Sequence, residues 1–87
     1  MADYTQEELK QIWSKGNQAS PMNNDNTWRK DIYGSLMKWE DYGNRSSLYG
    51  WEVDHIIPRA EGGPHIMSNW QPLQWQNNLE KANGIRR

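Results

Sequence analysis

The 87-residue sequence contains no cysteine. Disulfide bonds are therefore excluded, and so is any zinc site built from thiolates. A domain of this size buries only about 60 to 70 per cent of the surface of its unfolded chain, so packing and hydrogen bonds alone must hold its core. We therefore expect one domain over residues 1–87 and no structural zinc.

Long apolar runs are also missing, and the mean hydropathy is −1.15. No stretch approaches the length of a membrane span, and the first four residues, Met-Ala-Asp-Tyr, lack the basic and apolar regions of a secretion signal. We therefore expect no membrane partner and an intracellular, cytoplasmic location.

The chain also lacks a surplus of positive charge. Ten Lys and Arg stand against 11 Asp and Glu, which gives a formal net charge of −1, whereas nucleic-acid-binding proteins usually carry a basic surplus. From residue 59 onward, however, the balance changes to four basic residues against two acids (Arg59, Lys81, Arg86 and Arg87; Glu61 and Glu80). Any affinity for DNA should be modest and confined to one face.

Phenylalanine is absent, but the chain has six Trp and four Tyr. These side chains bury large apolar areas, and their N–H and O–H groups need hydrogen-bond partners. We therefore expect an aromatic core with polar contacts at its rim.

The amino-terminal segment has a clear helix pattern. Residues 5–8, Thr-Gln-Glu-Glu, form a capping box, and Gly16 is a natural stop. Three apolar residues lie between them at helical spacing (Leu9, Ile12 and Trp13). The pattern predicts an amphipathic helix over residues 5–15, followed by a polar, turn-rich loop over 17–27.

The middle and the end of the chain predict further elements. Residues 35–40 and 48–54 fit strands separated by a turn at 41–47, so we expect them to pair as a β-hairpin. Residues 77–82 fit a closing helix that ends at Asn-Gly, 83–84.

An acid and an imidazole stand side by side at Asp54 and His55, with β-branched residues around them. Neighbouring side chains of a strand point to opposite faces, so a turn at or beside this pair is needed to bring both to one ligand. Pro58 and the glycines at 62–63 predict such a departure from regular structure.

More polar residues follow downstream at Asn69, Asn78 and Lys81. One helical turn separates Asn78 from Lys81, so both can face the Asp54-His55 turn. An acid, a base, two carboxamides and an ammonium at one site suit an oxyanion substrate.

Four stretches together resemble the HNH endonuclease motif: Val-Asp-His-Ile-Ile-Pro at 53–58, Gly-Gly at 62–63, Ser-Asn-Trp-Gln-Pro-Leu at 68–73, and Asn-Asn-x-x-Lys at 77–81. The resemblance covers about residues 49–84, and segments 28–31 and 41–44 share it more loosely. It implies an α+β fold, a small ββα-metal (HNH) core with a β-hairpin and an additional N-terminal helix. Many relatives carry a zinc-binding CxxC pair at 74–77, where this chain has none. Trp70 and Trp75 are expected to replace that metal in packing.

The resemblance also implies a function. Such proteins are metal-dependent endonucleases that nick or cut double-stranded DNA and are typically bacterial or phage-encoded. By this resemblance Asp54 and Asn78 bind Mg²⁺ or Mn²⁺, His55 is the general base, and Asn69 holds the histidine's segment in place. Oxygen donors of this kind suit hard cations. One site cuts one strand, so a monomer predicts nicks and a homodimer double-strand breaks.

The sequence allows two roles for several of these residues. Arg29, Lys30 and Arg59 either contact DNA or are plain surface charges, and Lys81 either binds a phosphate or caps a helix. His65 is either a third metal ligand or an ordinary loop histidine. For the whole chain, the alternative to a nuclease is a non-catalytic module that binds nucleic acid or protein on the same ββα scaffold.

Overall fold

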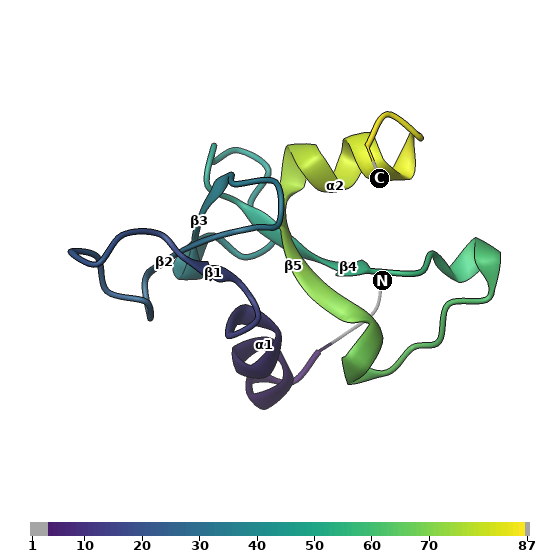
Figure 1. Ribbon diagram of the computed structural model, residues 1–87, viewed down its shortest axis with the longest axis horizontal. Coiled ribbons are helices and arrows are strands. Elements are labelled where there is room, and N and C mark those ends of the chain that lie inside the picture. The colour runs from purple at the N-terminus through teal and green to yellow at the C-terminus, as the bar shows by residue number, and fades with distance from the viewer. Residues whose placement is uncertain (1–3, 87) are drawn as a thin grey trace.

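A computed structural model describes residues 4–86, which form two α-helices and two antiparallel sheets (Figure 1). The elements in chain order are α1 (Gln6–Trp13), β1 (Asn17–Gln18), β2 (Trp28–Lys30), β3 (Leu36–Lys38), β4 (Trp51–His55), β5 (Trp70–Gln74) and α2 (Trp75–Ala82). The predicted α+β class is confirmed. Neither of the two helices described has the length and apolar character needed to cross a membrane.

The two-stranded sheet of β4 and β5 crosses the middle of the molecule, with α2 on one side and α1 on the other (Figure 1). Its register pairs Trp51 with Gln74 at one end and His55 with Trp70 at the other. The buried core lies where α1 meets this sheet and β3 (Leu9, Ile12, Trp13, Met37, Trp51 and Trp70). As expected, tryptophan rings dominate the core.

Helix α1 begins as predicted and ends slightly earlier, at Trp13. The amide of Glu8 donates to Thr5 Oγ1 at 3.0 Å, and the amide of Thr5 donates to Glu8 Oε1 at 2.9 Å. This reciprocal capping box satisfies two amides that the helix itself cannot pair.

The predicted pairing of residues 35–40 with 48–54 is wrong. β3 pairs with β2 instead, and β4 pairs with β5, a strand that the sequence did not predict. β5 offers five buried residues in a row, so β4 gains a longer and more fully buried partner there than in the three residues of β3. Two hydrogen bonds link the two segments in place of strand pairing: the Lys38 amide donates to the Tyr49 carbonyl at 3.1 Å, and Trp51 Nε1 donates to the Trp39 carbonyl at 3.2 Å.

Helix α2 begins at Trp75, two residues before the predicted start. The reason is the side chain of Gln74, whose Oε1 accepts from the amides of Gln76 and Asn77 at 3.0 and 3.1 Å. Glutamine is an unusual N-cap, so the sequence pattern did not indicate the start.

Asp31 joins the β2–β3 turn to the start of α2. Its side chain is buried, with 1% exposed, and Oδ1 accepts from the amides of Tyr33 and Ser35. Oδ2 accepts from the amide of Gln74 at 3.0 Å and from Asn77 Nδ2 at 2.9 Å. One carboxylate thus places the helix that carries Asn78 and Lys81.

Candidate active site

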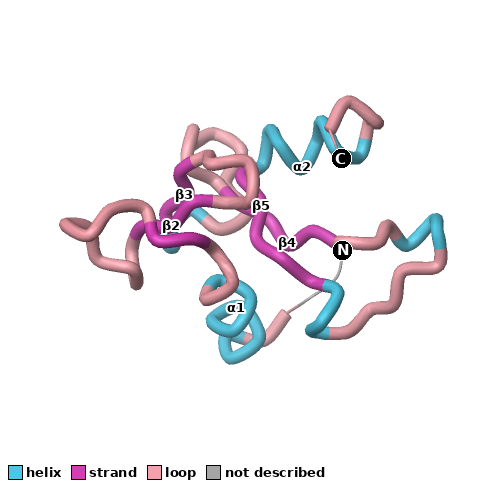
Figure 2. Tube along the Cα trace, in the orientation of Figure 1, coloured by secondary structure: helices cyan, strands magenta, loops and turns pink. Residues whose placement is uncertain are grey.

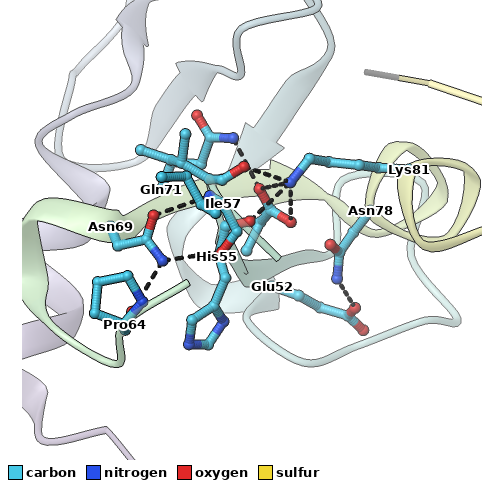
Figure 3. Close-up of polar contacts among 10 residues, drawn as sticks. Glu52, His55, Ile57, Pro64, Asn69, Gln71, Asn78 and Lys81 are labelled. Carbon is cyan, nitrogen blue, oxygen red and sulfur yellow. Dashed lines mark hydrogen bonds and ion pairs between the residues drawn. The ribbon is translucent and has the colours of Figure 1, made fainter. Parts of the chain in front are cut away.

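Two pairs of side chains connect β4 with α2 (Figure 3). Glu52 and Asp54 lie two residues apart on the strand, and Asn78 and Lys81 lie one helical turn apart, so each pair faces one way. Asn78 Nδ2 donates to Glu52 Oε1 at 2.9 Å, and Lys81 Nζ contacts both oxygens of Asp54 at 2.9 and 3.0 Å. The helix therefore meets the strand through two polar contacts.

Asp54 is surrounded by donors. Besides Lys81, Gln71 Nε2 donates to its Oδ2 at 2.8 Å from the neighbouring strand. The ammonium of Lys81 also donates to the backbone carbonyls of His55 and Ile56, at 2.7 and 3.3 Å. The side chains of Lys81 and Asp54 are only 13% and 9% exposed. Breaking such a sheltered pair costs about 3 to 5 kcal/mol, because one charge is left without compensation.

The carboxamide of Asn78 is held in one orientation. The guanidinium of Arg45 donates two hydrogen bonds to the carboxylate of Glu52, at 2.7 and 2.9 Å. Hydrogen bonding to Arg45 lowers the pKa of Glu52, so this carboxylate stays ionised. A carboxylate only accepts, so the NH₂ group of Asn78 must face Glu52. The Oδ1 atom of Asn78 is thereby the one that can serve a cation.

His55 is the last residue of β4, and the chain bends directly after it. Its Nε2 lies 3.0 Å from His65 Nδ1, and Trp70 Nε1 donates to it at 3.3 Å. Partial burial lowers the pKa of His55, and electrostatic repulsion from His65 and Arg59 lowers it further. The imidazole is therefore predominantly neutral at neutral pH, the form that accepts a proton.

The long loop between β4 and β5 (Figure 2) is held in place by hydrogen bonds of the Asn69 side chain (Figure 3). This side chain is 5% exposed; its Oδ1 accepts from the Ile57 amide at 2.9 Å, and its Nδ2 donates to the carbonyls of Ile57 and Pro64 at 3.1 and 2.9 Å. At Gly63 a Cβ atom would stand 1.7 Å from the Ile57 carbonyl oxygen, so only glycine allows this close approach. The loop that follows His55 thus has a defined path.

Replacing Asn69 by alanine is expected to destabilise the fold by about 1 to 3 kcal/mol, because three partly buried hydrogen bonds made by its buried side chain are lost. A thermal or urea unfolding curve measures this effect. The matched control is Asn23→Ala, since Asn23 is exposed and only its backbone amide is hydrogen-bonded, to Ser20. Equal unfolding midpoints for the two variants would contradict the role of Asn69 in holding the loop.

The four predicted DNA contacts lie in different places. Lys81 and Arg59 belong to the surroundings of Asp54 and His55. Arg29 and Lys30 lie on β2, at the opposite end of the molecule from the 56–66 loop (Figure 1). The guanidinium of Arg29 donates to the carbonyls of Asp25 and Gly16 at 3.2 and 2.9 Å, so it stabilises the fold there.

An open pocket brings several predicted site residues together: Asp54, His55, Asn78 and Lys81 all line it. Asp54 supplies a carboxylate and Asn78 a carboxamide oxygen, a donor set that fits a hard divalent cation. Lys81 already forms an ion pair with the carboxylate of Asp54. Asp54 can therefore coordinate a cation directly only if the ammonium of Lys81 moves aside. Within residues 4–86, no three His, Asp or Glu side chains gather as a ready metal site.

Three contributors were missed by the sequence interpretation: Glu52, Arg45 and Gln71. Glu52 stands two residues before Asp54, and strand alternation alone could have placed it on the same face. Arg45 and Gln71 had no such signal, because their roles depend on which strands pair.

The strand, loop, strand and helix from β4 to α2, with an Asp-His pair on the first strand and an Asn-x-x-Lys turn on the helix, define a ββα domain of the nuclease type. A family model described as HNH endonuclease matches residues 39–84, which is more than half of the chain, so the protein belongs to the HNH endonuclease family. Searches of curated proteins and of solved structures found no match.

Proposed function

We propose that the protein is a metal-dependent DNA endonuclease, with His55 as the general base and a divalent cation, Mg²⁺ or Mn²⁺, held by Asp54 and Asn78. The observation that supports this most is that these three side chains line one pocket inside the segment that matches the HNH family. Double-stranded DNA is the proposed substrate; Lys81 lines the pocket, and Arg59 is close enough for its charge to act on His55.

The proposed chemistry is hydrolysis of a phosphodiester. His55 takes a proton from the attacking water, the water oxygen bonds to phosphorus, and the bond to the 3′ oxygen breaks. The departing 3′ oxygen takes a proton from a second water, which leaves a 5′-phosphate and a 3′-hydroxyl. The cation, when bound, stabilises charge on the phosphoryl oxygens and on the departing oxygen. Glu52 keeps the Oδ1 atom of Asn78 available for that cation.

Removal of the metal tests this proposal. Supercoiled plasmid incubated with the protein and Mg²⁺ or Mn²⁺ should be converted to the nicked form, EDTA should stop the conversion, and excess metal should restore it. Linear product in a single step would indicate that two copies act together. Absence of nicking with either metal would reject the proposal.

A non-catalytic binding module on the same scaffold is the second candidate. The observation that favours it is the closed arrangement around Asp54, where Lys81 and Gln71 already satisfy the carboxylate. This candidate predicts DNA binding that weakens with salt and no cleavage in any divalent metal. The plasmid experiment therefore separates the two candidates.

Lys81→Met should increase the affinity of the metal-free protein for Mn²⁺ by about tenfold or more. Two unit positive charges about 4 Å apart repel by roughly 4 kcal/mol at an effective dielectric constant of about 20, a divalent cation doubles this cost, and 1.4 kcal/mol is a factor of ten. Titration calorimetry with Mn²⁺ alone measures the change, and circular dichroism checks the fold. Lys10→Met is the matched control, since Lys10 is exposed on α1. An unchanged affinity would indicate that the cation does not bind beside Asp54.

A further inference from the structure

A second open pocket, which we call the tyrosine pocket, lies beside the candidate active site. Its volume is about 520 Å³, a size typical of pockets that bind small molecules. The two pockets share Val53, His55 and Asn78, so they are neighbours along β4. The rest of the lining combines two aromatic rings, a glycine, a guanidinium and a carboxylate (Tyr4, Tyr42, Gly43, Arg45 and Glu52).

Both tyrosine rings of this pocket are held in place by tryptophans. The ring of Tyr4 meets that of Trp70 edge on, with centroids 4.9 Å apart and planes at 85°. The ring of Tyr42 lies 4.9 Å from that of Trp51, and the amide of the next residue, Gly43, donates to the Trp51 carbonyl at 2.9 Å. Tyr42 nevertheless stays 39% exposed. A fixed aromatic surface is therefore open to a ligand.

The guanidinium of Arg45 in the same pocket is only partly used. Its Nε and Nη2 atoms donate to Glu52, whereas Nη1 has no hydrogen-bond partner among residues 4–86, and the side chain is 52% exposed. Arg45 therefore keeps N–H groups that can donate to a phosphate oxygen. Aromatic rings beside a cation are the means by which many proteins bind the unpaired bases of a nucleic-acid strand.

We propose that the tyrosine pocket binds one unpaired nucleobase of the DNA, next to the phosphodiester that is cleaved, and that this base stacks on Tyr42. The inference rests on the proposed function, in which the neighbouring pocket holds that phosphodiester. Every base has a flat face, so stacking selects an unpaired base and not a particular sequence. A base in an intact pair must first be unpaired and unstacked, whereas a bulged base has no partner to lose. DNA with a bulge should therefore be preferred.

Three labelled duplexes of one sequence test this preference. The first is fully paired, the second carries one extra thymidine as a bulge, and the third has an abasic nucleotide at the bulged position, so that it keeps the distorted backbone but lacks the base. Fluorescence anisotropy in EDTA measures Kd without metal-dependent cleavage. We expect the wild type to bind the thymine bulge about fivefold to a hundredfold more tightly than the abasic bulge, the range for one base stacked on an aromatic ring.

Substitutions at Tyr42 separate stacking from simple packing. Tyr42→Leu keeps apolar volume beside Trp51 but removes the ring, so the preference for the thymine bulge over the abasic bulge should disappear. Tyr42→Phe keeps the ring and should keep the preference. Tyr49→Leu is the matched control, because Tyr49 is a half-buried tyrosine that does not line this pocket. An unfolding curve checks each variant, and the comparison of the two bulges with the wild type decides the matter even if a variant fails to fold.

Cleavage gives a second readout. With Mg²⁺ or Mn²⁺, cuts in the thymine-bulge duplex should map to a phosphodiester beside the bulge. A wild type that nicks plasmid but binds the thymine and abasic bulges equally would overturn this inference alone. A wild type that prefers the thymine bulge but nicks no DNA with either metal would overturn the proposed function, while the base-binding role of the tyrosine pocket would stand.

Discussion

His55→Ala should lower the rate of metal-dependent nicking by about 10² to 10⁴, the usual contribution of a positioned general base. The imidazole of His55 lines the pocket, and its lowered pKa keeps it predominantly neutral at neutral pH, the form that accepts a proton. Its contact with Lys81 uses the backbone carbonyl of His55, so the substitution leaves that hydrogen bond in place. The rate should therefore fall without unfolding of the protein.

The measurement is the initial rate of plasmid nicking at saturating Mg²⁺ or Mn²⁺, with an unfolding curve for each variant. Ile56→Ala is a suitable control, because Ile56 is the next residue, is 45% exposed and has no acid–base chemistry. It should retain most of the wild-type rate. Equal nicking by His55→Ala and wild type would show that the observed cleavage does not use this imidazole.

Features that depend on neighbours in the sequence could be predicted. The capping box of Thr5 and Glu8 involves residues three positions apart, and α1 begins where it predicts. The HNH resemblance depended on the order and spacing of short motifs, and the family match over residues 39–84 confirms it. Both signals lie in the linear sequence and need no knowledge of strand pairing.

Strand β5 could not be predicted in the same way. It contains Pro72, which cannot donate to a ladder, and two glutamines, which read as loop residues. In the structure Pro72 stands opposite Val53, and Gln71 and Gln74 are buried with hydrogen-bond partners on β4 and in the loop before it. Their burial follows from the partner strand, so single-sequence patterns gave no sign of it.

The candidate site likewise combines residues that the sequence motif predicts with contacts that depend on tertiary structure. Asp54, His55, Asn69 and Asn78 are candidates because of their motif, but the contacts of Asp54 with Lys81 and of Asn78 with Glu52 depend on how α2 lies across β4. Asn78 meets Glu52 and Lys81 meets Asp54 across 26 and 27 residues of sequence. The hydrogen bonds from Arg45 to Glu52 also depend on the position of the loop before β4, which carries Arg45. Distances of this kind follow from tertiary packing, which a motif does not encode.

The position of α2 in turn depends on Asp31, and we expect Asp31→Ala to lower the free energy of unfolding by about 3 to 5 kcal/mol. The substitution removes the acceptor of the amides of Tyr33, Ser35 and Gln74, in a place that is 1% exposed. Asn77 Nδ2 also loses its contact with Asp31 and keeps its hydrogen bond to Ser35 Oγ. The same change also removes a negative charge from the N-terminal end of a helix, where it is favourable. For a domain of this size each 1 kcal/mol shifts Tm by about 4 to 8 °C, so the midpoint should fall by more than about 12 °C.

Asp31→Asn should cost almost as much. All four partners of Asp31 donate hydrogen bonds, and an asparagine must turn its NH₂ group, another donor, toward two of them. Asp25→Asn is the matched control: Asp25 is half-buried as a residue, and its buried Oδ1 atom has no hydrogen-bond partner within residues 4–86. The substitution therefore breaks no hydrogen bond to that atom and should change stability by less than about 1 kcal/mol. Similar melting temperatures for Asp31→Asn and Asp25→Asn would contradict the role of Asp31. A selective loss at Asp31 would instead mean that a carboxylate 47 residues away in sequence sets the placement of Asn78 and, through it, the geometry of the proposed cation site.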